Sequence, residues 1–314
     1  MAIKLDLQVA ELLQKIEESG IPPMHDMGYV QARNFYNSSS ETGAGEPPQD
    51  VDIENIILET SFPLPARIYR SPELRKDPQP ALIYFHGGGW CIGNIDSHDH
   101  VCRWLAKKSE AIVISVDYRL APEHKFPAAV DDAYQATCWI FEHAIELGLD
   151  PARIAVGGDS AGGNLSAVVC LLARDEGKVK IHSQLLIYPA TDMLMRFPSH
   201  VSNGDDYRLT RTLINWFVCG YLRNGEDMND MRASPLMAES HANLPPALIL
   251  TAGFDPLIDE GKAYADKLEE EGGEVEYLCY EGMIHGFIAM PGFINTALTA
   301  LDDSATYLKK RFSS

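Results

Sequence analysis

The chain has 314 residues, of which 46% are hydrophobic and 23% charged, values typical of a globular protein whose core is large enough to fold without disulfides. Its formal net charge of −19 repels phosphate backbones, which argues against nucleic acid as a partner. No stretch is long and apolar enough to span a membrane, and the N-terminus lacks a signal peptide, so we expect a cytoplasmic protein.

The cysteines indicate neither disulfides nor a metal site. No two of the six are close enough in sequence to form a CxxC pair, and several lie in apolar runs, as Cys170 does. We interpret them as reduced side chains that act as small hydrophobes. A structural metal site needs clustered Cys and His, which the sequence lacks, so we expect no metal ion and no cofactor.

The first 45 residues predict a helical arm ahead of the main domain. Val9, Leu12, Leu13 and Ile16 recur at helical spacing, and Gly20 with the two prolines after it would stop that helix. The polar stretch from 37 to 50 predicts a loop. We therefore assign residues 1–45 to a separate N-terminal arm.

From residue 51 onward, short apolar runs alternate with longer amphipathic ones. Strands are predicted at 51–60, 64–70, 81–86, 111–118, 153–158, 184–189, 247–252 and 275–280. Helices are predicted at 98–108, 127–147, 161–175, 259–272 and 293–311. Continuous apolar strands separated by helices indicate an α/β fold with a parallel sheet covered on both faces.

One interval interrupts this alternation. Residues 192–244 contain no good strand and are rich in Met, Asn, Asp and aromatic side chains. We interpret this segment as a helical insertion over the sheet. The main domain is then formed by residues 46–191 and 245–314.

A candidate nucleophile lies in the sequence Gly158-Asp159-Ser160-Ala161-Gly162. This Gly-x-Ser-x-Gly pattern follows an apolar run at 154–156 and precedes a helical stretch, which is the strand, tight turn and helix that such an elbow requires. The glycines are needed because the turn is too sharp for side chains. The N-terminus of the following helix would favour a developing negative charge.

A second glycine-rich turn, His86-Gly87-Gly88-Gly89-Trp90, follows the strand predicted at 81–86. Residues without side chains let backbone N–H groups approach a ligand closely. The position of this turn, after a strand and upstream of the elbow, is typical of an oxyanion loop. A glycine-rich turn without a ligand is the alternative.

A base and an acid should follow the nucleophile in the order nucleophile, acid, base. His285 follows the last strand and is flanked by glycine, whereas His182 precedes a strand and His200 and His241 lie in or near the insertion. His285 is therefore the candidate base, with a purely structural histidine as the alternative. Asp255, at the end of the preceding strand, is preferred as the acid over Asp259, which more plausibly begins a helix.

Together these residues resemble the hormone-sensitive-lipase-like family of α/β-hydrolase esterases, in its bacterial carboxylesterase branch. The resemblance extends from about residue 51 to the C-terminus. It rests on six segments, at 86–90, 117–123, 126–128, 158–165, 255–257 and 285–287.

The resemblance implies an α/β-hydrolase fold with an eight-stranded, mostly parallel sheet and a helical cap built from the arm and the insertion. It further implies a carboxylesterase that hydrolyses short- to medium-chain acyl esters through Ser160, His285 and Asp255. In this family the oxyanion hole corresponds to Gly88, Gly89 and Ala161. A homodimer through the edge strand near 275–280 is also compatible with the resemblance.

Three aromatic residues are candidates for the acyl pocket: Trp216, Phe217 and Phe287. The alternative, that they simply pack the cap, has equal support from the sequence. His86 and Asp159 are expected to support the two glycine-rich turns rather than to react. The expected ligand is a small-molecule ester.

Overall fold

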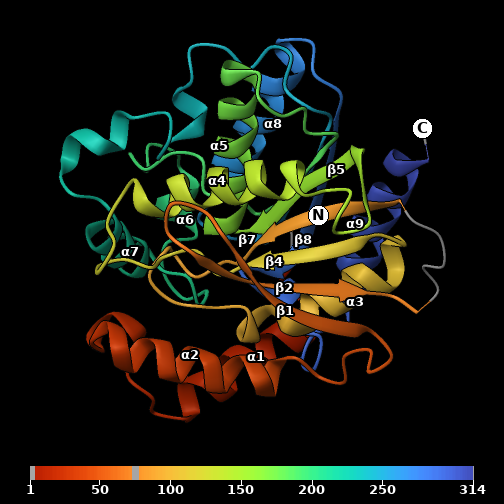
Figure 1. Ribbon diagram of the computed structural model, residues 1–314. Coiled ribbons are helices and arrows are strands. Elements are labelled where there is room, and N and C mark those ends of the chain that lie inside the picture. The colour runs from red at the N-terminus through yellow and green to blue at the C-terminus, as the bar shows by residue number, and fades with distance from the viewer. Residues whose placement is uncertain (1–3, 73–77, 314) are drawn as a thin grey trace.

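The computed structural model describes residues 4–72 and 78–313 and contains one eight-stranded sheet (Figure 1). Its strand order is β1-β2-β4-β3-β5-β6-β7-β8. The strands are β1 (Asp52–Leu58), β2 (Leu64–Arg70), β3 (Gln79–Phe85), β4 (Ile112–Val116), β5 (Leu149–Asp159), β6 (Gln184–Ile187), β7 (Ala247–Phe254) and β8 (Val275–Ile284). Each predicted strand is present, with ends shifted by a few residues.

Seven of the eight strands run in one direction. Strand β2 alone pairs antiparallel with both of its neighbours, β1 and β4, and the pairs from β3 to β8 are parallel. The central strands β3, β4 and β6 are almost entirely buried, as expected for strands covered on both faces. The prediction of an eight-stranded, mostly parallel α/β sheet is confirmed.

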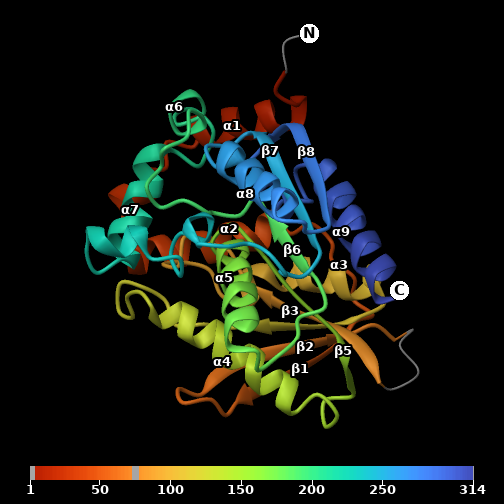
Figure 2. The same cartoon turned by 90° about the horizontal axis from the view of Figure 1, so that it is seen from above.

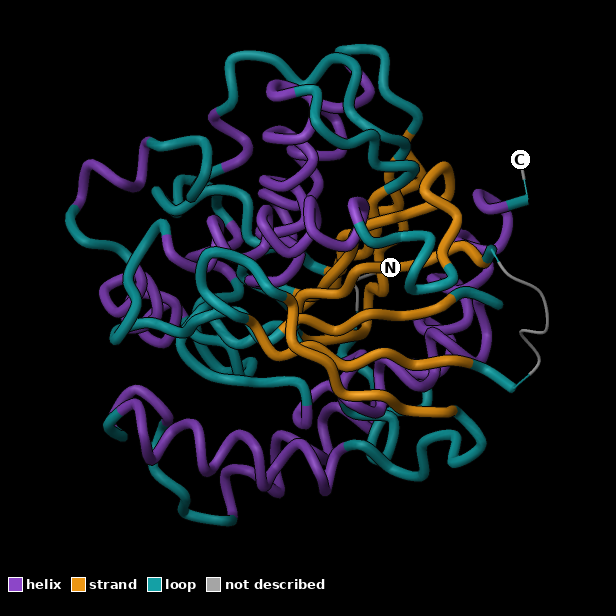
Figure 3. Tube along the Cα trace, viewed as in Figure 1, coloured by secondary structure: helices purple, strands orange, loops and turns teal. Residues whose placement is uncertain are grey.

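Helices cover both faces of this sheet (Figures 2 and 3). Helices α4 (Ala128–Glu142), α5 (Ala161–Glu176) and α8 (Ile258–Glu270) pack over one face, and α3 (Asp99–Ser109) and α9 (Thr296–Phe312) over the other. The buried apolar side chains accordingly form two clusters, one on each side of the sheet. Helix α4 ends before the predicted residue 147, because residues 143–148 form turns that close at Gly148, whose φ is +74°.

The N-terminal arm contains α1 (Leu7–Glu18), the short helix η1 (Met24–Asp26) and α2 (Tyr29–Gly43). The loop predicted from residue 37 is wrong as far as residue 43, because α2 continues to that point. Gly43 accepts a hydrogen bond of 2.9 Å from the N–H of Gly292, and it packs against Met290. Tertiary contact thus maintains a helix that the polar sequence does not favour by itself.

The insertion contains no strand and consists of α6 (Ser199–Ser202), α7 (Arg211–Tyr221), η3 (Gly225–Asn229) and η4 (Pro235–Met237). It lies beside the N-terminal arm (Figures 1 and 2), where Tyr29 stacks on Trp216 with ring centroids 4.1 Å apart. Two further short helices are η2 (Asp96–His98) and η5 (Phe287–Ala289). None of the helices formed by residues 4–72 and 78–313 combines the length and the apolarity needed to cross a membrane.

Candidate active site

Ser160 occupies a sharp turn between β5 and α5. Its φ is +56°, a conformation that non-glycine residues rarely adopt outside strained functional turns. A Cβ built on Gly158 would lie 2.2 Å from the carbonyl oxygen of Phe85, and one on Gly162 would lie 1.8 Å from the same atom. The two glycines are therefore required because the elbow packs directly on the end of β3.

Hydrogen bonds connect this serine to His285, and His285 in turn to Asp255. The imidazole Nε2 is 2.9 Å from Ser160 Oγ, and Nδ1 is 2.7 Å from Asp255 Oδ2. Asp255 is fully buried and His285 is 8% exposed, whereas Ser160 is half-buried. The other carboxylate oxygen of Asp255 accepts a 2.8 Å hydrogen bond from the N–H of Leu257, which orients the carboxylate toward the imidazole.

The competing candidates lie elsewhere. Asp259 accepts a hydrogen bond of 2.9 Å from the N–H of Ser199. His200 is paired with Glu260, and the imidazole of His241 bonds to the carbonyl of Pro235. His182 lies at the amino end of β6, away from the strand ends that carry the serine.

The glycine-rich turn at 86–90 places free donors beside the elbow. Gly88 and Gly89 have φ of +119° and +55°, and within the described chain their N–H groups meet no acceptor. Ala161 is the first residue of α5, so its N–H has no acceptor within the helix either. The two turns thus offer three backbone donors at one end of the sheet.

Asp159 joins these two turns. Its buried Oδ1 accepts hydrogen bonds from the N–H of Gly87 at 2.9 Å and the hydroxyl of Tyr84 at 2.7 Å. His98 Nε2 lies 3.4 Å from the same oxygen. Burial by itself would raise the pKa of Asp159, but His98 and Tyr84 outweigh burial and lower it to about 2. The position of His98 beside Asp159 was not predicted from the sequence, because no motif marks this histidine.

His86 has a supporting position. It is fully buried, its Nδ1 lies 2.7 Å from the carbonyl oxygen of Gly87, and its ring stacks on Tyr118. Burial lowers the pKa of His86 to about 3, so the imidazole is neutral and Nδ1 can donate to the Gly87 carbonyl. This contact supports the glycine-rich turn, which is the role expected of His86 from the sequence.

The three aromatic pocket candidates have different environments. The Phe217 ring lies over Gly89, where an added Cβ would come within 2.2 Å of it, and Trp216 packs edge-on against Phe217. Phe287 is fully buried beside Tyr188 and Tyr280, in the core cluster that contains α3 and α9. Phe217 thus lies against the glycine-rich turn and Trp216 beside Phe217, whereas Phe287 is packed in the core.

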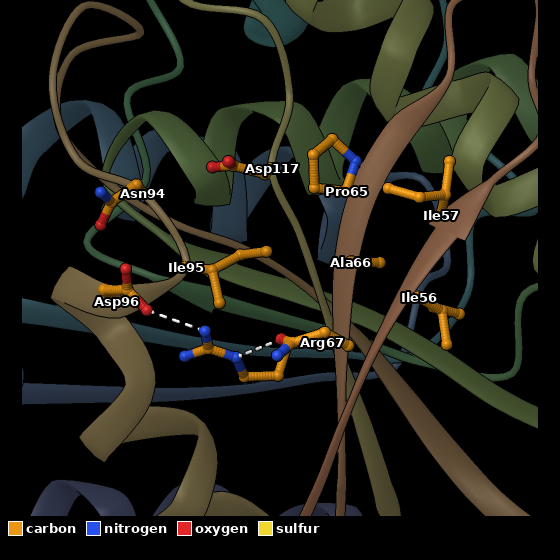
Figure 4. A pocket seen from close by; sticks show the side chains of 10 residues that line it. Ile56, Ile57, Pro65, Ala66, Arg67, Asn94, Ile95, Asp96 and Asp117 are labelled. Carbon is orange, nitrogen blue, oxygen red and sulfur yellow. Dashed lines mark hydrogen bonds and ion pairs between the residues drawn. The ribbon is translucent and has the colours of Figure 1, made fainter.

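A separate surface pocket of about 320 Å³ lies between β1, β2 and the segment 94–96 (Figure 4). Arg67 forms an ion pair of 2.8 Å with Asp96 at its edge. Asp117, which also lines it, has its pKa raised to about 6 by burial. None of Ser160, Asp255 and His285 lines this pocket. Elsewhere too, the described residues form no group of three or more His, Cys, Asp or Glu side chains suited to a metal ion.

An elbow serine in hydrogen-bond series with a histidine and an aspartate, on a sheet of this topology, defines the class of α/β hydrolases. The profile of the alpha/beta hydrolase fold family matches residues 82–289, so the chain belongs to that family. The resemblance to hormone-sensitive-lipase-like esterases is thereby confirmed.

Characterised relatives span most of the chain. The chain is 49% identical to carboxylic ester hydrolase LipN of Mycobacterium tuberculosis, over 84% of this chain and 71% of LipN. It is 38% identical to an ethyl acetate hydrolase of Pseudomonas putida, over 94% of this chain and 95% of the relative. Among solved structures, the hyperthermophilic esterase of Pyrobaculum calidifontis has a TM-score of 0.91 and 40% identity, with 98% of each chain covered.

Proposed function

We propose that the protein is a serine carboxylesterase, with Ser160 as nucleophile, His285 as base and Asp255 as the acid that orients it. The observation that supports this best is the continuous hydrogen-bond series through the three side chains, ending on a serine in a strained elbow. Relatives named carboxylic ester hydrolase and ethyl acetate hydrolase support ester hydrolysis as the reaction.

Acylation begins when Ser160 Oγ attacks the ester carbonyl and His285 Nε2 takes its proton. Asp255 holds Nδ1–H of the imidazole and stabilises the charged form. The carbonyl oxygen becomes an oxyanion that accepts from the N–H groups of Gly88, Gly89 and Ala161; one such donor is worth about 3 kcal/mol. The imidazolium then protonates the departing alcohol, and an acyl-enzyme remains.

Deacylation repeats these steps with water as the nucleophile. His285 takes a proton from a water molecule that attacks the acyl carbonyl, and the same N–H groups hold the second oxyanion. The proton then returns to Ser160 Oγ as the carboxylic acid is released. All proton transfers in this scheme involve His285, which Asp255 keeps in one tautomer.

The aromatic side chains over the oxyanion loop favour short- to medium-chain acyl groups. Phe217 lies against Gly89, and the Tyr29–Trp216 stack joins the N-terminal arm to the insertion above the site. We infer that these two segments act as a cap and limit the length of the acyl chain that fits beneath them.

The test is hydrolysis of p-nitrophenyl esters from acetate to palmitate by the wild type and by Ser160→Ala. We expect turnover that is highest on short and medium chains and is lost in the variant by at least roughly 10⁴-fold. Activity that survives the substitution would refute Ser160 as the nucleophile. Faster turnover of palmitate than of butyrate would refute the size limit.

A further inference from the structure

The insertion places a positive charge beside the proposed base. Arg208 lies between α6 and α7, and its Nη1 would be 2.7 Å from a Cβ built on Gly286, the residue after His285. Burial and neighbouring acidic groups raise the pKa values of the Tyr36 and Tyr188 hydroxyls, and the charge of Arg208 acts against that rise at both. The Tyr188 ring packs against His285 with centroids 4.6 Å apart.

The neighbours of Arg208 hold its backbone in place. Its φ is +53°, in the left-handed region that arginine rarely adopts. The residues on either side are anchored: Tyr207 packs on Phe254 with ring centroids 5.1 Å apart, and Leu209 is buried. The strained residue between these two anchors is therefore positioned by its neighbours rather than by a partner of its own.

Arg208 has no counter-ion in the described part of the chain. Three other arginines of the insertion have a carboxylate within 4 Å, in the pairs Arg196–Asp192, Arg223–Asp227 and Arg232–Asp230. No hydrogen bond or ion pair joins Arg208 to any residue of 4–72 or 78–313, although it is half-buried. Within the described residues no acceptor meets its five N–H donors, and such a planar fork suits a planar anion.

We propose that Arg208 binds a carboxylate of the substrate, so that the preferred esters are those with an anionic group near the scissile bond. This specificity rests on the esterase function proposed above. The carboxylate can belong to the acyl part, as in a monoester of a dicarboxylic acid, or to the alcohol part, as in an ester of a hydroxy acid. Arginine presents a bidentate fork to either one.

Two pairs of substrates show whether the carboxylate that Arg208 binds belongs to the acyl part or to the alcohol part of the ester. In the first pair, mono-p-nitrophenyl glutarate is compared with p-nitrophenyl valerate, so that only the acyl part differs in charge. In the second pair, 4-butyryloxybenzoate is compared with 4-butyryloxybenzamide, so that only the alcohol part does. For each pair, the ratio of kcat/KM for the anionic to the neutral ester is measured in wild type and variants at one fixed ionic strength.

We expect Arg208→Met to lower this ratio by roughly ten- to a hundredfold in one of the two pairs, mainly through KM, because a charge-assisted hydrogen bond is lost. Arg208→Lys should restore part of the ratio. Arg211→Met is the matched control, since Arg211 carries the same charge in the same insertion but is exposed on α7. Circular dichroism and thermal midpoints establish that the variants are folded.

One result would overturn the role of Arg208, namely a ratio that Arg208→Met leaves unchanged in both pairs. If kcat/KM falls equally on anionic and neutral esters, so that the ratio is unchanged, Arg208 only balances the acidic groups of the site. Arg208→Gln provides a second test should the methionine variant not fold. If the wild type hydrolyses none of the four esters, the esterase function itself fails, so the two failures are distinguishable.

Discussion

Asp159, next to the nucleophile in sequence, has no proposed chemical step, yet it contacts both turns of the site. Its Oδ1 atom accepts the N–H of Gly87 and so orients the start of the proposed oxyanion loop. The fully buried imidazole of His98 lies beside it, with Nε2 3.4 Å from the same oxygen. We regard both as positioning residues.

Asp159→Asn is expected to lower kcat by roughly ten- to a hundredfold with little change in KM, because the oxyanion donors shift while the ester pocket remains. The measurement is steady-state kinetics on p-nitrophenyl butyrate. His98→Asn should give the same pattern, and His124→Asn, at an exposed position, serves as the control. A wild-type kcat in Asp159→Asn would show that the negative charge of Asp159 is not needed at this position.

Gly89 tests the oxyanion loop itself. A methyl group here would come within 2.2 Å of the Phe217 ring, and the φ of +55° disfavours any side chain. Gly89→Ala should therefore reduce kcat by roughly a hundredfold or more, because a displaced donor no longer meets the oxyanion. In Gly225→Ala, where an added Cβ meets nothing within 4 Å, the kinetics should match those of the wild type. Equal kinetics for both variants would contradict the loop assignment.

At the scale of elements, α6 ties the insertion to the loop that carries Asp255. The Ser199 hydroxyl donates to the carbonyl of Pro256 at 2.6 Å, and the Asn203 amide donates to the carbonyl of Asp255 at 3.1 Å. His200 Nε2 lies 2.6 Å from Glu260 Oε2, and both side chains are 1% exposed. The insertion thus helps to fix the acid of the proposed triad.

Glu260→Ala should lower the free energy of unfolding by about 3–5 kcal/mol, because it leaves buried His200 without its partner. It also removes the acceptor for the N–H of Thr191, 2.6 Å away. The measurement is urea denaturation followed by circular dichroism. Glu269→Ala, at an exposed position on the same helix α8, should change stability by less than about 0.5 kcal/mol. If the two substitutions changed the free energy of unfolding equally, the buried His200–Glu260 pair would not stabilise the insertion.

At the scale of the whole molecule, buried histidines make stability depend on pH. Burial lowers the pKa of His86 to about 3 and that of His100 to about 4, from the ordinary value of 6.5. The unfolded chain therefore takes up protons below pH 6.5 that the folded chain does not bind. The free energy of unfolding should fall as pH drops from 6.5 to about 4, by up to about 1.4 kcal/mol per pH unit for each group.

In His100→Asn, the free energy of unfolding should depend less steeply on pH between 6.5 and 4, because the contribution of His100 is absent. Urea midpoints measured at several pH values in that range provide the test, and His124→Asn, at an exposed position, should keep the wild-type slope. Asp159 contributes outside this window, because its pKa of about 2 lies below the ordinary 3.8, so its contribution is lost only between those two values. Equal slopes for His100→Asn and wild type would refute the prediction.

The homodimer stays a prediction. Strand β8 forms one edge of the sheet, and Leu278 on it is 39% exposed, so a second copy can pair there. We expect sedimentation velocity to give a dimer for the wild type and a monomer for Leu278→Lys. A wild type that is monomeric at micromolar concentration would refute this predicted interface.

From the amino-acid sequence we predicted the strands, the elbow and the three residues proposed as nucleophile, acid and base. The strands and the elbow depend on short-range patterns, namely apolar runs of strand length and glycines at fixed offsets from Ser160. The acid and the base depend on a fixed chain order, which placed Asp255 and His285 after strands. Parallel strands that share one sheet bring their carboxyl ends together, so residues 125 positions apart in sequence, Ser160 and His285, meet as the order predicts.

The contacts that no local pattern encodes become known only from the folded structure. The end of α2 is helical because Gly43 meets Gly292, and the pKa of Asp159 is lowered because His98 and Tyr84 lie beside it. That the guanidinium of Arg208 meets no counter-ion among residues 4–72 and 78–313 is visible only once its neighbours are known. These features depend on residues that are distant in the chain, and the burial that sets their energies exists only in the folded protein.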